Sequence, residues 1–187
     1  IIGDNTTIDA NVHIKSYTTI GSNCNIFHGA VIGEIPQDLK FNGEKTFINI
    51  GNNTTIREFC TLNRGTVDTG NTKIGNNCLL MAYVHVAHDC IINDFSILSN
   101  SVQVGGHVEV GKYAIVGGMT PIHQFCKVGD YSFTGGGLRI VQDIPPYIMA
   151  MNEPLTYSGL NNTGLRRHNF SSQCRTIIKK VYKIIYQ

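Results

Sequence analysis

The chain has 187 residues, a formal net charge of +2 and 42% hydrophobic residues, enough for one sizeable core with a small appendage. No run approaches the roughly 18 to 20 unbroken apolar residues that a membrane span needs, and no segment is organised like a secretory signal peptide. We therefore expect a cytoplasmic protein with no integral membrane segment and no nucleic-acid partner. Ile1 already lies in a repeat and Gln187 in an apolar-periodic segment, so we expect a fragment at both ends.

A hexapeptide repeat runs through residues 2–140. Of the 24 positions taken every sixth residue from Ile2 to Ile140, 20 are Ile, Leu or Val. This period is neither the 3.6 of an α-helix nor the 2 of a simple strand. It fits short strands joined by corners, with three hexapeptides to a coil, and such coils bury their apolar faces by stacking. The sequence therefore predicts an all-β fold, a parallel β-helix of hexapeptide repeats over residues 1–144.

The other positions of the repeat support this fold. The fourth position is often Asn, which tolerates the positive φ of a tight corner. The fifth position is small and faces inward. Its members include five of the six cysteines, Cys24, Cys60, Cys78, Cys90 and Cys126. We interpret these as small buried hydrophobes rather than disulfide partners, zinc ligands or nucleophiles.

Two insertions and a C-terminal segment interrupt or follow the repeat. The loops lie at residues 33–49 and 63–73. The aliphatic positions that flank them, Ile32 and Ile50, and Leu62 and Ile74, are separated by whole multiples of six, so the repeat resumes in phase. Pro145 and Pro146 end it, and residues 145–187 are predicted to be a linker and the start of a helical domain. Ser171 or Ser172 is a plausible N-cap for a helix that reaches Gln187. Residues 165–187 hold six basic and no acidic residues, which suggests an acidic or phosphate-bearing partner or only a solvated helix face.

The histidines form the strongest indication of a site. Counting one coil of three hexapeptides on from His88 gives Gly106, beside His107, and counting a second coil gives Gln124, beside His123. The coil arithmetic thus predicts a cluster at one edge of three stacked coils. Such a cluster could serve general-base catalysis, bind zinc as in the β-helical γ-class carbonic anhydrases, or form a structural ladder in a catalytically silent trimeric scaffold. In those carbonic anhydrases the two ligand histidines lie five positions apart. No two histidines of this chain have that spacing, so we expect no bound metal.

Several runs resemble the bacterial UDP-N-acetylglucosamine O-acyltransferases, a family of hexapeptide acyltransferases. They are GEIPQDLKFNGE, RGTVDTG, LLMAYVHVAHDC, GGHVEVGKYAIVGGMTPIHQFC and QDIPPY. The resemblance implies a left-handed β-helix, a hand that the repeat alone does not give, and a homotrimer with active sites between subunits. It also implies transfer of a 3-hydroxyacyl group from acyl carrier protein to the 3-hydroxyl of UDP-N-acetylglucosamine, in lipid A biosynthesis and without a cofactor.

The same resemblance assigns roles to residues. His88 matches the general base, Asp89 follows it and helps orient it, and the Gly106 amide matches the oxyanion donor. The matching substrate contacts are Asp38, Lys40, His85, His107, His123, Gln124, Asn161 and Arg167. Gly136 matches the position that limits the length of the acyl chain. The basic residues expected to dock the acidic carrier protein are Arg166, Arg175, Lys179, Lys180 and Lys183.

Overall fold

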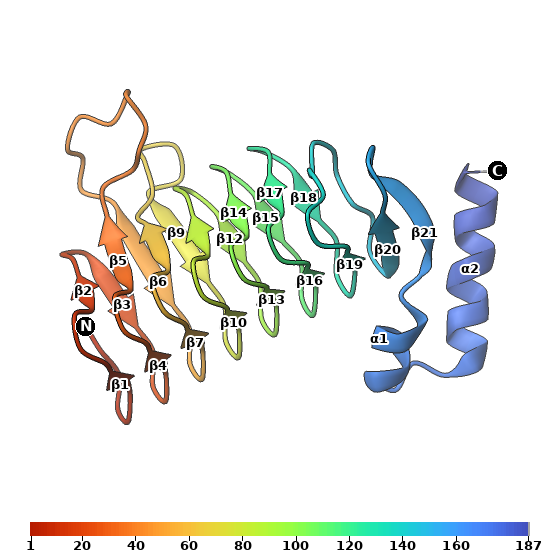
Figure 1. Cartoon of the computed structure of the whole chain (residues 1–187), viewed down its shortest axis with the longest axis horizontal. Helices are drawn as coiled ribbons and strands as arrows, with labels where there is room; N and C mark the ends of the chain where they lie inside the picture. Colours follow the sequence, from red (N-terminus) through yellow and green to blue (C-terminus); the bar gives the residue numbers. More distant parts are fainter. Residues whose placement is uncertain (187) are drawn as a thin grey trace.

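A computed structural model describes residues 1–186 of the chain. The molecule is a long prism of stacked coils, with a helix across its C-terminal end (Figure 1). The prism is a left-handed parallel β-helix, as predicted, and its strands form three sheets.

The strands of each sheet follow one another along the prism. One sheet runs β1 (Thr7–Ile8), β4 (Asn25–Ile26), β7 (Thr55–Ile56), β10 (Leu79–Leu80), β13 (Ile97–Leu98), β16 (Ile115–Val116), β19 (Phe133–Thr134), β20 (Ile148–Met151), β21 (Thr156–Leu160). The second runs β2 (His13–Ile14), β5 (Val31–Glu34), β8 (Thr61–Asn63), β11 (His85–Val86), β14 (Gln103–Val104), β17 (Pro121–Ile122). The third runs β3 (Thr18–Ile20), β6 (Phe47–Ile50), β9 (Asn71–Ile74), β12 (Ile91–Ile92), β15 (Glu109–Val110), β18 (Lys127–Val128).

The register of these sheets confirms the coil of three hexapeptides. Ile14 pairs with Ile32, and Val86 pairs with Val104, in each case one such coil apart. Across the first insertion Ile20 pairs with Ile50, and across the second Ile50 pairs with Ile74. The first insertion thus adds two hexapeptides to its coil and the second adds one, and the aliphatic series stays in phase.

The core is the inside of this prism. The periodic aliphatic residues are buried along its length, from Ile20 and Ile26 to Val128 and Ile140. The five repeat cysteines are buried among them and free. Burial raises the thiol pKa of Cys60 and Cys90 to about 12 and that of Cys78 to about 11. At neutral pH these thiols stay protonated and are therefore poor nucleophiles, in agreement with the sequence prediction.

The corners hold a feature that the repeat pattern did not predict. The fourth residue of the hexapeptide has positive φ not only at asparagines such as Asn77 but also at Phe95, Tyr113 and Phe125. A left-handed conformation costs an ordinary residue about 1 to 2 kcal/mol. Phe95 and Tyr113 stack at 4.6 Å, and Tyr113 and Tyr131 at 4.8 Å. Such pairs contribute about 0.5 to 1.5 kcal/mol each, which offsets much of the backbone cost.

The C-terminal segment begins as a continuation of the prism. β20 pairs in parallel with β19, so the sheet extends past residue 144, and β21 then folds back antiparallel to β20. Helix α2 (Ser172–Tyr186) starts as predicted, with the Cys174 amide donating to Ser171 Oγ at 3.1 Å. The last residue of the predicted helix, Gln187, lies outside the described residues. A short helix, α1 (Asn162–Arg167), was not predicted. It buries one residue, Leu165, so its sequence has no apolar stripe at helical spacing.

Within residues 1–186, neither helix has the length and apolar character that a membrane crossing requires.

Candidate active site

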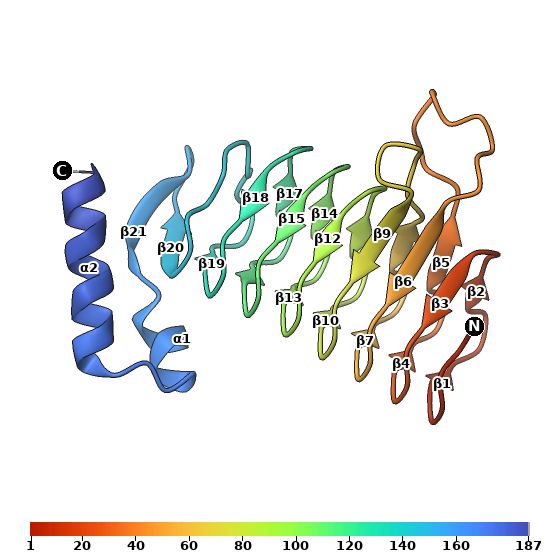
Figure 2. The same cartoon turned by 180° about the vertical axis from the view of Figure 1, so that it is seen from behind.

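One edge of the prism carries both projecting loops and the histidine cluster. The loops lie between β5 and β6 (residues 35–46) and between β8 and β9 (residues 64–70), and both rise from the same side of the prism (Figures 1 and 2). β11, β14 and β17 follow β8 in one sheet, and β12, β15 and β18 follow β9 in the next. The corners at residues 87–90, 105–108 and 123–126 therefore continue the line of the loops. We call this line of corners the loop edge.

His88 lies in the first of these corners, beside the 64–70 loop. Its Nδ1 is 2.8 Å from Oδ2 of Asp89, and 15% of its side chain is exposed. An ionised carboxylate can only accept hydrogen bonds, so it favours the tautomer with the hydrogen on Nδ1. Within residues 1–186, Nε2 of His88 has no hydrogen-bond partner. That nitrogen is thus left as the free basic atom.

Asp89 is fully buried and held by the 64–70 loop. The Thr66 amide donates to its Oδ1 and Oδ2 at 3.0 and 3.1 Å, and the Thr66 hydroxyl donates to Oδ2 at 2.6 Å. The Thr69 hydroxyl donates to Oδ1. Burial alone would raise the pKa of Asp89, but the hydrogen bonds from Thr66, Thr69 and His88 outweigh it and keep the pKa below its usual value. The carboxylate therefore stays ionised at neutral pH.

Gly106 lies against the His88 ring, as the coil arithmetic predicted. A Cβ on Gly106 would stand 2.6 Å from Cε1 and 2.8 Å from Nε2 of His88, so no side chain fits without moving the ring. The Gly106 carbonyl accepts from the Phe125 amide at 3.0 Å. The Gly106 amide makes no hydrogen bond to any described residue, which leaves a donor close to the free His88 nitrogen.

His107 closes the cluster on the next coil. Its ring meets that of His88 edge-on, with centroids 5.2 Å apart, and stacks on Phe125 at 4.5 Å. Its Nε2 is 3.7 Å from Oδ2 of Asp68 and 3.8 Å from Oδ2 of Asp89. His107 is therefore rigidly placed by aromatic packing, with one nitrogen toward two carboxylates.

The other predicted histidines are near this cluster but not in it. His85 is partly buried on β11, where its Nδ1 is 2.7 Å from Thr61 Oγ1, and desolvation lowers its pKa. His123 and Gln124 occupy the third corner of the loop edge, both exposed, with His123 Nδ1 3.1 Å from the Gln124 carbonyl. The structure thus places these three residues on the same or neighbouring coils as His88 and His107. His85 lies on the strand that leads into the His88 corner.

The cluster also offers three possible metal-ligand atoms. One atom each from His88, Asp89 and His107 lies within 4.8 Å of the others. Both carboxylate oxygens of Asp89, however, already accept hydrogen bonds from Thr66, Thr69 and His88. A metal would have to displace these donors, so the present geometry suits proton transfer better than metal binding.

The predicted substrate contacts outside the histidine corners lie in three further places. Asp38 and Lys40 are in the 35–46 loop, where Asp38 Oδ1 accepts from the Lys40 amide at 3.0 Å and shapes a turn. Asn161 caps α1: its Oδ1 accepts from the Gly164 amide at 3.0 Å and its Nδ2 donates to the Tyr131 carbonyl at 2.9 Å. Arg167 is exposed in the last turn of α1. Among the described residues, no hydrogen bond or ion pair links these four side chains to His88 within one chain.

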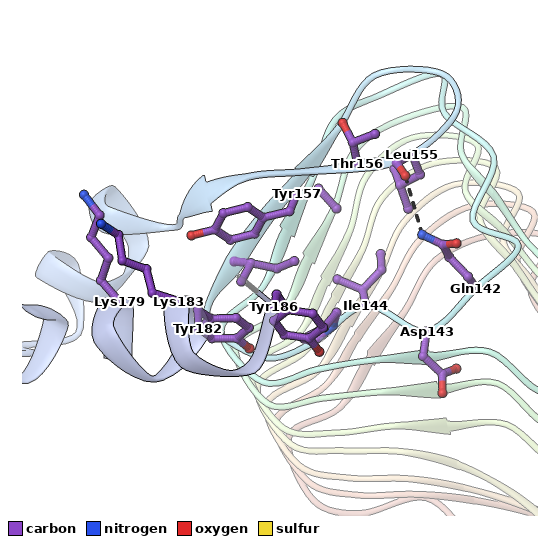
Figure 3. A pocket seen from close by; sticks show the side chains of 13 residues that line it. Gln142, Asp143, Ile144, Leu155, Thr156, Tyr157, Lys179, Tyr182, Lys183 and Tyr186 are labelled. Atoms are coloured by element: carbon purple, nitrogen blue, oxygen red, sulfur yellow. Dashed lines mark hydrogen bonds between the residues drawn. The ribbon is translucent and has the colours of Figure 1, made fainter. Parts of the chain in front are cut away.

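The predicted docking residues lie on α1 and α2. Lys179 and Lys183 line a hollow of about 510 Å³ with Tyr157, Tyr182 and Tyr186 (Figure 3). This hollow lies between α2, the β20–β21 hairpin and residues 142–145, and none of the histidines lines it. Arg166 and Lys180 are exposed, whereas Arg175 donates from Nη1 to the Phe170 carbonyl at 2.5 Å.

The hexapeptide period does not indicate the two threonines that hold Asp89. Thr66 and Thr69 lie in the inserted RGTVDTG run, and the hexapeptide period says nothing about side chains within an insertion. A usable signal existed, because that insertion replaces the corner that lies one coil before His88 and Asp89. Hydroxyl-bearing residues at that place could have been assigned to the buried carboxylate.

Known proteins share both the repeat and the C-terminal segment. The family model described as UDP N-acetylglucosamine O-acyltransferase, domain 2, matches residues 143–187, and the bacterial transferase hexapeptide model matches residues 1–34 and 71–106. An acyl-[acyl-carrier-protein]–UDP-N-acetylglucosamine O-acyltransferase of Saccharophagus degradans is 52% identical over 187 residues, covering 100% of this chain and 72% of that protein. The chain belongs to the UDP-N-acetylglucosamine O-acyltransferase family.

Other members of the UDP-N-acetylglucosamine O-acyltransferase family agree in sequence and in fold. The protein of that name from Thiobacillus denitrificans is 48% identical over 163 residues, which cover 87% of this chain and 63% of the relative. The solved UDP-N-acetylglucosamine acyltransferase of Bacteroides fragilis has a TM-score of 0.98 and 50% identity, covering 100% of this chain and 73% of that one. The chain thus spans less than two thirds of the Thiobacillus relative and about three quarters of the Bacteroides structure.

Proposed function

We propose that this chain catalyses transfer of a 3-hydroxyacyl group from acyl carrier protein to the 3-hydroxyl of UDP-N-acetylglucosamine, in lipid A biosynthesis. The relatives' names supply the substrates. The observation that carries the chemistry is the pairing of His88, whose Nδ1 is on Asp89, with the amide of Gly106. Neither His88 Nε2 nor this amide has a hydrogen-bond partner among residues 1–186. A base and an oxyanion donor side by side are what acyl transfer to a hydroxyl requires.

The reaction follows from this pair. His88 Nε2 takes the proton from the sugar 3-hydroxyl as its oxygen attacks the thioester carbonyl. The Gly106 amide donates to the oxygen that becomes negative, a contribution of about 2.7 to 4 kcal/mol for such donors. Collapse of the tetrahedral intermediate breaks the carbon–sulfur bond and forms the ester. The departing thiolate of the carrier then takes the proton back from His88, which restores the base.

Asp89 and His107 assist His88. The buried Asp89 carboxylate stabilises the imidazolium that forms when His88 is protonated, because the two charges are in direct contact at low dielectric. His107 stacks on Phe125 and meets the His88 ring edge-on, which places it next to the base. We assign His107, His85, His123 and Gln124 to sugar and nucleotide contacts along the loop edge, with Asp38 and Lys40 reaching from the 35–46 loop.

We further propose that the active form is a homotrimer. The prism exposes large apolar side chains that a single chain leaves uncovered, including Tyr83, Met119 and Phe125, which are 57%, 72% and 62% exposed. A subunit contact would bury these side chains, and exposed apolar surface often marks such contacts. Asn161 and Arg167, remote from His88 in one chain, would then meet the substrate of a neighbouring subunit.

The decisive experiment replaces His88. In His88→Ala the turnover of UDP-N-acetylglucosamine with 3-hydroxyacyl carrier protein should fall about 10²- to 10⁴-fold, the usual contribution of a general base. His13→Ala is the matched control, because His13 is exposed on β2, at the N-terminal end of the prism. Near-full activity in a folded His88→Ala protein would refute the assignment, and absence of ester formation by the unaltered protein would refute the activity.

A further inference from the structure

The 64–70 loop encloses the buried carboxylate of Asp89 with donors. Thr66 contributes its amide and its hydroxyl, at 3.0 to 3.1 Å and 2.6 Å, and Thr69 contributes a second hydroxyl. The backbone of Asp89 is also held, because its amide donates to Thr72 Oγ1 at 2.8 Å. The Asp89 side chain has no exposed surface. Among the described residues, its carboxylate is hydrogen-bonded by Thr66, Thr69 and His88, and His107 Nε2 lies 3.8 Å from its Oδ2.

We propose that Thr66 and Thr69 are positioning residues for acyl transfer, which act through Asp89 to keep the hydrogen of His88 on Nδ1 and its Nε2 free. This inference rests on the proposed function, since it concerns how the base of that reaction is prepared. It assigns a task to the 64–70 loop that is distinct from contact with substrate.

The direction of each hydrogen bond supports this role. An ionised carboxylate has only acceptor sites, so the Thr66 amide, both hydroxyls and His88 Nδ1 must all donate to it. The Thr69 hydroxyl also lies 3.0 Å from the Asn71 carbonyl, but it has one hydrogen, and the charged oxygen is the stronger acceptor. With its other lone pairs occupied by Thr66 and Thr69, the carboxylate cannot rotate away from the imidazole.

The backbone of Asp89 makes such support necessary. Asp89 sits at a corner with φ of +60°, and its side chain points into protein rather than water. A buried carboxylate without donors is costly, and it would take up a proton or turn outward. Either change would remove the acceptor that fixes the His88 tautomer. A misplacement of about 1 Å in a catalytic group can lower the rate by about 10²-fold.

A purely structural role is the competing explanation, because both hydroxyls also close the loop. The Asp68 amide donates to Thr66 Oγ1 at 3.3 Å, and the Asn71 amide donates to Thr69 Oγ1 at 3.3 Å. Both explanations predict that Thr→Val is harmful and that Thr→Ser is tolerated, so they separate only in the Asp89→Asn background and in the signal of the His88 ring. Valine keeps the shape and loses the donor, whereas serine keeps the donor and loses a methyl group.

The test measures turnover and the His88 ring in the same variants. We expect Thr66→Val with Thr69→Val to lower kcat about 10- to 100-fold while KM for both substrates changes less than about threefold. Thr66→Ser with Thr69→Ser should keep kcat within about threefold. In an Asp89→Asn background the two valines should cause no further loss, because residues that act as one unit are not additive.

The ring measurement needs no substrate and separates this inference from the proposed function. Nitrogen-15 NMR of labelled histidine should report the Nδ1–H tautomer of His88 in the unaltered protein and a mixture in the valine pair. Thr54→Val is the matched control: its buried hydroxyl donates to the Gly75 carbonyl at 2.8 Å, away from Asp89, so kcat and the His88 signal should not change.

Any of three results would overturn the inference. The first is a His88 signal that stays the same in the valine pair. The second is an equal loss of kcat in the serine and valine pairs. The third is a loss of kcat in the valine pair that adds fully to that of Asp89→Asn. If the unaltered protein transferred no acyl group yet its His88 ring responded to the valines, the positioning role would stand and the proposed function would fall.

Discussion

Gly106 lies one full coil after His88, and the face of its Cα is in contact with the imidazole. A Cβ there would be 2.6 Å from Cε1 and 2.8 Å from Nε2 of His88, although the backbone of Gly106 is not in the left-handed region. Glycine is thus required for space rather than for conformation. The same residue leaves room for the His88 ring and places its own backbone amide next to that ring. Under the proposed mechanism, a substitution here would therefore disturb the base and the oxyanion donor together.

Gly106→Ala should therefore disable the site without unfolding the protein. The added methyl group pushes the His88 ring off its position, and we expect turnover to fall by about 10²-fold. The measurement is kcat together with the thermal unfolding midpoint. Gly118→Ala is a control at the same place of a later hexapeptide, where the nearest atom to a Cβ is the Asn100 carbonyl oxygen, at 3.1 Å. A fully active Gly106→Ala protein would show that His88 does not act from the position seen here.

The sequence predicted the part of this site that depends on the period. Because the coils between residues 74 and 140 are each three hexapeptides long, the neighbours of His88 follow from counting, and Gly106 and His107 lie where the count puts them. The count says nothing about residues within insertions, and at corners it gives a residue's neighbours but not its backbone conformation or the stacking of its side chain. Thr66 and Thr69 were missed for that reason, and so were the stacked corner aromatics such as Phe95 and Tyr113.

Helix α1 shows a second limit of the sequence. It is six residues long and includes a glycine, so its intrinsic helix propensity is low. Tertiary contacts form it instead, through the Asn161 cap, which also bonds to Tyr131, and through the buried Leu165. A local pattern cannot indicate a helix whose stability comes from distant residues.

The site should work without a bound metal. His88, Asp89 and His107 could offer three ligand atoms, but zinc would have to compete with the donors from Thr66 and Thr69 for the Asp89 oxygens. We expect elemental analysis of the purified protein to find well under one zinc per chain, and a chelator to leave turnover unchanged. Stoichiometric zinc whose removal abolishes activity would support a zinc enzyme of the carbonic anhydrase type instead.

The basic face of α2 should affect the carrier protein more than the nucleotide sugar. Lys179 and Lys180 are exposed near the middle of α2, whereas Arg175 is partly engaged with the Phe170 carbonyl and a change there would also disturb the helix start. Lys179→Glu with Lys180→Glu should raise KM for the acyl carrier protein and leave KM for UDP-N-acetylglucosamine unchanged. The effect should weaken with added salt, since exposed charges are screened beyond about 8 Å at physiological ionic strength. Equal changes in both constants would argue against docking at this face.

The last prediction concerns the length of the acyl chain. Gly136 is exposed, and the left-handed residue of its corner is its neighbour Gly137, with φ of +70°. The conformation of the corner therefore does not require glycine at position 136. A Cβ there would meet the Gly118 carbonyl oxygen at 3.0 Å, a tight contact that a small shift can relieve. We thus expect Gly136→Met to fold and to fill space along the surface that an acyl chain would follow.

The expected result is a change of preference rather than a loss of activity. Each methylene that the methionine displaces removes about 0.8 kcal/mol of burial, roughly a fourfold change in preference per carbon. Competition between carrier proteins loaded with 3-hydroxyacyl chains of different length measures it directly. Gly137→Ala is the matched control, because a left-handed alanine costs about 1 to 2 kcal/mol of stability and its Cβ would meet no atom within 4 Å. If Gly136→Met lost stability and kept the selectivity of the unaltered protein, Gly136 would not be the residue that sets chain length.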